Sequence, residues 1–111
     1  MLMRRAAPLA IAMVCSIGLS MTKAQERGDP AAGLDYALQH CATCHAIRKG
    51  HSLSPRPDAP GFENIANTSG ITGISLAAAL HSVHENMPNF ILPLKERDDM
   101  IAYILTLKRG N

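Results

Sequence analysis

Two cysteines and one histidine lie within five consecutive residues, Cys41-Ala42-Thr43-Cys44-His45. Two thiols three positions apart on a helical turn can reach both vinyl groups of one porphyrin and form thioether bonds. The next residue, His45, then supplies an axial nitrogen ligand to the iron. This C-x-x-C-H pattern is typical of covalent haem attachment. We therefore predict that Cys41 and Cys44 bind one haem c and that His45 binds its iron.

Three other interpretations of this pentapeptide are weaker. A thioredoxin-like redox pair belongs at the end of a strand in an α/β unit, and no alternating strand pattern is visible. A structural zinc site needs a second pair of ligands at matching spacing, and the only other cysteine, Cys15, lies in an apolar N-terminal run. A disulfide between Cys41 and Cys44 would close too small a loop to add much stability.

The second axial ligand is expected from Met87, which lies 42 positions after His45 and directly before a proline. This methionine falls in a loop between two predicted helices, and the proline stiffens the loop and removes one backbone donor. Most methionines fill hydrophobic cores, and Met100, within the last predicted helix, fits that role. His81 and His84 are the alternative distal ligands.

Apolar side chains recur at three- and four-residue steps in three segments, which predicts an all-α fold with three main helices. Gly28 and Asp29 are the candidate N-caps of the first helix, and Ser75 is the expected N-cap of the second. The segment from Arg48 to Gly73 is rich in proline and glycine, so it admits only one helical turn, at 62–66. The predicted main helices are Gly28–His45, Leu76–Glu85 and Lys95–Lys108.

The first 24 residues have the pattern of a secretory signal peptide, which leaves residues 25–111 as one haem-binding domain. Two arginines precede an apolar run from Ala6 to Leu19, and a small residue, Ala24, ends the segment. The run is too short to span a bilayer, which needs about 20 residues. We therefore expect export to the periplasm, without stable membrane insertion after cleavage. An uncleaved anchor and a lipid-modified Cys15 are the alternatives.

Removal of this segment leaves eight basic and nine acidic residues, a formal charge of −1 with histidine neutral. The sequence has no clustered basic face, which argues against nucleic-acid binding. The remaining 87 residues contain no tryptophan, two phenylalanines and two tyrosines. A domain this small with few aromatic residues usually needs a covalent cross-link or a bound metal to be stable. A covalently bound haem would serve this purpose.

The segments fall in an order that resembles the class I cytochrome c family, of the compact bacterial type. The resemblance implies that His45 and Met87 are the iron ligands of one haem wrapped by three helices. It further implies that the Pro60 carbonyl accepts the His45 Nδ1–H bond, that Phe62 covers the haem, and that Gly33 contacts Tyr103. The matching segments are Gly33, Cys41–His45, Ala59-Pro60-Gly61-Phe62, Asn86-Met87-Pro88 and Asp99–Ile104.

A haem iron with both axial positions filled has no open site for a substrate, so we expect electron transfer and no enzymatic activity. The expected function is that of a monomeric periplasmic single-electron carrier. Its donor would be a dehydrogenase or a quinol-oxidising complex, and its acceptor an oxidase or peroxidase. The alternatives are a haem subunit of one dehydrogenase complex and a ligand-binding haem sensor with a weak distal bond. A dihaem peroxidase would need a second C-x-x-C-H, which the sequence lacks.

Overall fold

The computed structural model describes residues 28–82 and 86–110, and the expected signal peptide, residues 1–24, lies outside them. The regular elements of the described residues are all helical, which confirms the predicted all-α fold with three main helices. No helix among them is both long enough and apolar enough to cross a bilayer. The helices are α1 (Pro30–His40), α2 (Phe62–Ala66), α3 (Gly73–His81) and α4 (Leu94–Thr106).

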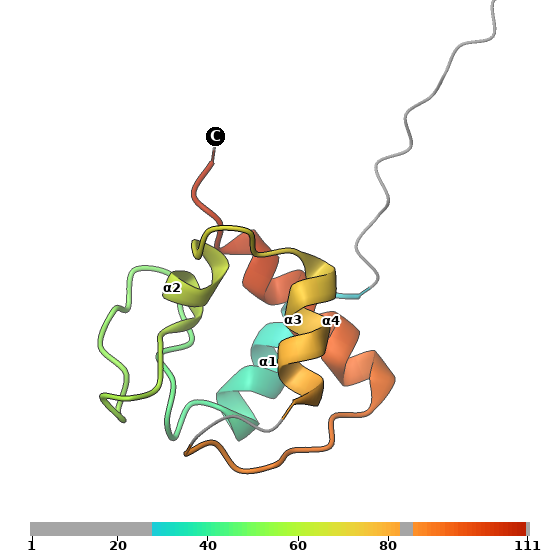
Figure 1. Cartoon of the computed structure of the whole chain (residues 1–111), viewed down its shortest axis with the longest axis horizontal. Coiled ribbons are helices and arrows are strands. Elements are labelled where there is room, and N and C mark those ends of the chain that lie inside the picture. Colours follow the sequence, from blue (N-terminus) through green and yellow to red (C-terminus); the bar gives the residue numbers. More distant parts are fainter. Residues whose placement is uncertain (1–27, 83–85, 111) are drawn as a thin grey trace, which may run out of the picture.

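Helix α4 is the central element, and the other three helices all pack against it (Figure 1). Its contact with α1 is the most extensive. Residues 99–104 of α4 are all buried, and this segment contributes Met100, Ile101 and Ile104 to the core. Leu76 of α3 and Ala37 of α1 pack into the same cluster. Burial of this apolar surface stabilises the bundle.

The first helix begins at Pro30, two residues after the predicted start, and ends five residues before the predicted His45. Asp29 is the N-cap, its side chain accepting a hydrogen bond from the Ala31 amide at 2.9 Å. At the other end, the Ala37 carbonyl accepts from the amides of both Cys41 and Ala42. The hydrogen-bond ladder therefore slips by one residue, and regular α-helix stops at His40. Residues 41–44 continue as turns rather than as the predicted helix.

The second main helix begins earlier than predicted, because the N-cap is Thr72 and not Ser75. Thr72 Oγ1 accepts from the Ser75 amide at 3.1 Å, and Ser75 Oγ accepts from the Thr72 amide at 2.8 Å. This reciprocal pair is a capping box. Helix α3 ends at His81, and residues 83–85 of the predicted helix lie outside the described residues. Helix α4 ends at Thr106, two residues before the predicted Lys108.

Gly33 allows α1 and α4 to approach each other closely. A Cβ atom at this position would overlap the Asp99 carbonyl oxygen and lie 2.9 Å from Tyr103 Cβ. The predicted contact between Gly33 and Tyr103 is therefore confirmed. The main obstacle to a larger side chain is the α4 backbone, which cannot move without shifting the whole helix.

Gly33→Ala should lower the free energy of unfolding by about 2–3 kcal/mol, the cost of overpacking a tight contact. Helix propensity alone would predict the opposite, a gain of about 1 kcal/mol. Denaturant unfolding followed by circular dichroism checks this. Gly110→Ala is the matched control, because no atom lies within 4 Å of a Cβ at that position. An unchanged midpoint for the Gly33 variant would contradict the close crossing.

Candidate functional site

An apolar cavity lies between α2, α3, α4 and the loops that follow α1 and α3. Its volume is about 270 Å³, and it is partly open to solvent. This volume is close to the lower end of the range for ligand pockets, about 300–1,000 Å³. Its walls include Ile65, Leu76, Leu80 and Ile104. The cavity therefore suits a mostly apolar ligand.

All six site residues predicted from the sequence line this cavity, although they come from three separate segments. The alternative distal ligands do not join them among the described residues. His81 is the exposed last residue of α3 and is not part of the lining. His84 lies outside the described residues. The six that meet are Cys41, Cys44, His45, Pro60, Phe62 and Met87.

A backbone carbonyl group orients the His45 ring through a hydrogen bond. Its Nδ1–H donates to the Pro60 carbonyl oxygen at 2.7 Å, the hydrogen bond that the resemblance implied. A proton fixed on Nδ1 leaves Nε2 with a free electron pair, the form of imidazole that binds a metal. The Phe62 ring lies beside it, with ring centroids 5.5 Å apart. Phe62 is itself held by its amide, which donates to the Ala46 carbonyl at 2.8 Å.

The loop that carries Pro60 is anchored to the helical core. The buried Tyr103 hydroxyl of α4 donates to the Ile47 carbonyl at 2.8 Å. The Ala46 amide donates to Ser54 Oγ at 3.0 Å, which closes the loop on itself. These contacts fix the backbone directly after His45, so the ring and its carbonyl partner keep their relative positions.

The two thiols are not joined in a disulfide. Burial, and to a smaller extent the neighbouring Cys44, raises the pKa of Cys41 to about 11. Cys41 is therefore protonated at neutral pH, whereas a redox-active C-x-x-C needs a thiol of lowered pKa. The described residues also contain no cluster of three or more Cys, His, Asp or Glu side chains that could hold a metal ion. Both findings oppose the redox and zinc interpretations.

Two methionines line the cavity, one more than the sequence predicted. Met87 is half-buried in the loop between α3 and α4, whereas Met100 is fully buried within α4. The sequence placed Met100 on the buried side of the last helix, but periodicity cannot tell a core position from a cavity wall. Only the packing of α4 identifies Met100 as part of the site.

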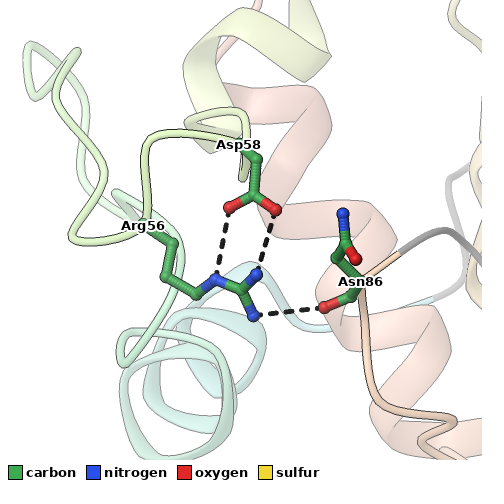
Figure 2. Close-up of polar contacts among 3 residues, drawn as sticks. All are labelled: Arg56, Asp58 and Asn86. Atoms are coloured by element: carbon green, nitrogen blue, oxygen red, sulfur yellow. Dashed lines mark hydrogen bonds and ion pairs between the residues drawn. The ribbon is translucent and has the colours of Figure 1, made fainter.

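Sequence analysis also missed a polar group at the cavity, formed by Arg56, Asp58 and Asn86. The Arg56 guanidinium donates to both carboxylate oxygens of Asp58 and to the Asn86 carbonyl oxygen (Figure 2). Hydrogen bonding to Asp58 raises the pKa of Arg56, which keeps the guanidinium charged at every relevant pH. No local pattern marks this group, because Arg56 and Asn86 are 30 positions apart.

The cavity is consistent with a covalently bound haem. Its walls are apolar, two free thiols lie at the C-x-x-C-H spacing, and a histidine oriented through Nδ1 lies beside them. Searches of curated proteins and of solved structures returned no match. The family model described as Cytochrome c matches residues 31–108, which is most of the chain and includes every residue of the cavity. The chain therefore belongs to the cytochrome c family and is a class I c-type cytochrome, with covalently bound haem c that serves electron transfer.

Proposed function

We propose that this protein is a periplasmic single-electron carrier whose haem iron is ligated by His45 Nε2 and the Met87 sulfur. One observation carries the proposal. His45 and Met87 are 42 positions apart, yet both line the apolar cavity that also contains the two thiols. In this proposal Cys41 and Cys44 form the thioether bonds, Pro60 orients the His45 ring, and Phe62 covers one part of the haem.

The bound haem supplies a one-electron iron couple. The residues of the chain set the energy of that couple. A methionine opposite a histidine raises the reduction potential relative to two nitrogen ligands. The apolar walls act in the same direction, because a low-polarity site disfavours the extra positive charge of the oxidised form. If His45 and Met87 both ligate the iron, no position on it would remain for a substrate, so we propose no enzymatic turnover.

The partners in this proposal are redox proteins that dock briefly. The donor is a dehydrogenase or a quinol-oxidising complex, and the acceptor is an oxidase or peroxidase. Weak electron-transfer complexes of this kind bury less than about 1,200 Å². The exported domain acts as a monomer, does not bind nucleic acid and is not stably inserted in a membrane.

Expression of the full chain and of residues 25–111 alone tests this function in a bacterium that attaches haem c in its periplasm. The full chain should give a periplasmic protein that keeps its pigment through acid–acetone extraction. It should titrate as a single reversible one-electron couple. The shorter chain should yield little pigmented protein. Abundant pigmented protein in the cytoplasm would contradict the proposed location, and pigment lost to the solvent would contradict thioether attachment.

A further inference from the structure

Arg56 joins the two loops that carry the proposed iron ligands. Its amide donates to the Cys44 carbonyl at 3.2 Å, beside His45. Its side-chain Nη1 donates to the Asn86 carbonyl, also at 3.2 Å, directly before Met87. One residue thus connects the attachment motif to the methionine loop, and it lines the cavity between them.

Asp58 determines which guanidinium nitrogen remains available for the methionine loop. Its two oxygens accept from Nε at 3.2 Å and from Nη2 at 3.0 Å, in a two-pronged arrangement that leaves Nη1 to reach Asn86 (Figure 2). Both side chains of this ion pair are nearly half exposed. An exposed pair adds little stability by itself, so its main effect is to orient the guanidinium.

The backbone at Asn86 has a conformation that a tether can help to hold. Asn86 has a φ of 62°, which places it in the left-handed region. Among residues other than glycine, asparagine accepts this region most readily. The loop from Asn86 to Pro93 contains no helix or strand. Its position relative to the attachment motif therefore depends on individual contacts such as the one from Arg56.

We propose that Arg56, oriented by Asp58, is a positioning residue that holds the Met87 loop closed and so limits access of external ligands to the iron. The inference rests on the proposed ligation by Met87. An external ligand must displace the methionine sulfur, so its apparent affinity is proportional to the fraction of molecules in which the loop is open. Loss of the Arg56 contact increases that fraction.

Imidazole titration of the oxidised holoprotein measures this fraction. Arg56→Gln should bind imidazole about three- to tenfold more tightly than the wild type, the range expected for loss of one hydrogen bond. Asp58→Asn should shift the affinity in the same direction by a smaller factor. Arg56→Lys should not restore the wild-type imidazole affinity. A lysine ammonium lacks the planar fork of N–H donors with which a guanidinium can bind Asp58 and Asn86 together. Arg109→Gln, at the exposed end of the chain beyond α4, is the control and should leave the affinity unchanged.

The optical spectrum of the oxidised wild type separates failure of this inference from failure of the proposed function. Absence of the long-wavelength sulfur-to-iron band in the wild type would overturn ligation by Met87. If the band is present, equal imidazole affinity in the wild type, Arg56→Gln and Asp58→Asn would overturn the positioning role. Asp58→Asn keeps the arginine and so carries the test if Arg56→Gln does not yield holoprotein. Full restoration by Arg56→Lys would overturn the role of the fork geometry.

Discussion

Replacement of both Cys41 and Cys44 by alanine should abolish covalent haem attachment and leave a largely unfolded chain. The helices and loops surround a cavity of about 270 Å³, whereas protein interiors are normally close-packed. At about 24 cal/mol per Å³, leaving that volume unfilled would cost about 6 kcal/mol. This cost is comparable to the whole stability of a small domain, about 5–15 kcal/mol. The few buried aromatic residues, Phe62 and Tyr103, cannot compensate.

Acid–acetone extraction and far-ultraviolet circular dichroism of the exported double variant measure the two effects. Pigment should pass entirely into the solvent, and helical signal should fall well below that of the wild type. Thr43→Ala is the matched control, because Thr43 lies exposed between the two cysteines and its loss should leave both properties unchanged. A colourless double variant that keeps its helices would show that the fold does not depend on haem.

Replacement of Met87 by alanine should remove the sulfur-to-iron absorption band and lower the reduction potential by about 0.1–0.3 V. Axial ligands move haem potentials over about 0.8 V, and the methionine sulfur favours the reduced form. The substitution also opens one axial position, so the reduced variant should bind carbon monoxide rapidly. The reduced wild type should bind it slowly or not at all, because the sulfur occupies that position.

Met100→Leu is the control that the structure makes necessary, because Met100 also lines the cavity. Leucine preserves most of the side-chain volume, so this variant should keep the band and a potential near that of the wild type. Loss of the band in Met100→Leu but not in Met87→Ala would reverse the assignment. Rapid carbon monoxide binding by the wild type would favour a ligand-binding sensor over an electron carrier.

The features that depend on neighbouring residues could be predicted from the sequence. The attachment motif is contiguous, so its chemistry was visible before any fold was known. Helical periodicity predicted α1, α3 and α4, because an amphipathic face repeats within a single element. The contact of Gly33 with Tyr103 and the hydrogen bond from His45 to Pro60 came from the family resemblance. The structure contains both.

Helix ends were harder to predict, because they depend on single hydrogen bonds. Thr72 and Ser75 are both good capping residues, and Ser75 was expected to cap the helix from outside. In the structure each caps the backbone amide of the other, which adds Ser75 to the helix. The end of α1 depends on which amides share the Ala37 carbonyl. The amino-acid composition of the segment does not indicate which amides will share that carbonyl.

The sequence by itself therefore determined the prosthetic group, the helical class and the residues that could ligate the iron. The tertiary structure alone decided which side chains form the cavity wall and which groups connect its two sides. Met100 reaches the wall because α4 packs against three other helices. Arg56 meets Asn86 because the folded core brings two distant loops together. Such contacts depend on three-dimensional distance, which neither periodicity nor spacing along the chain encodes.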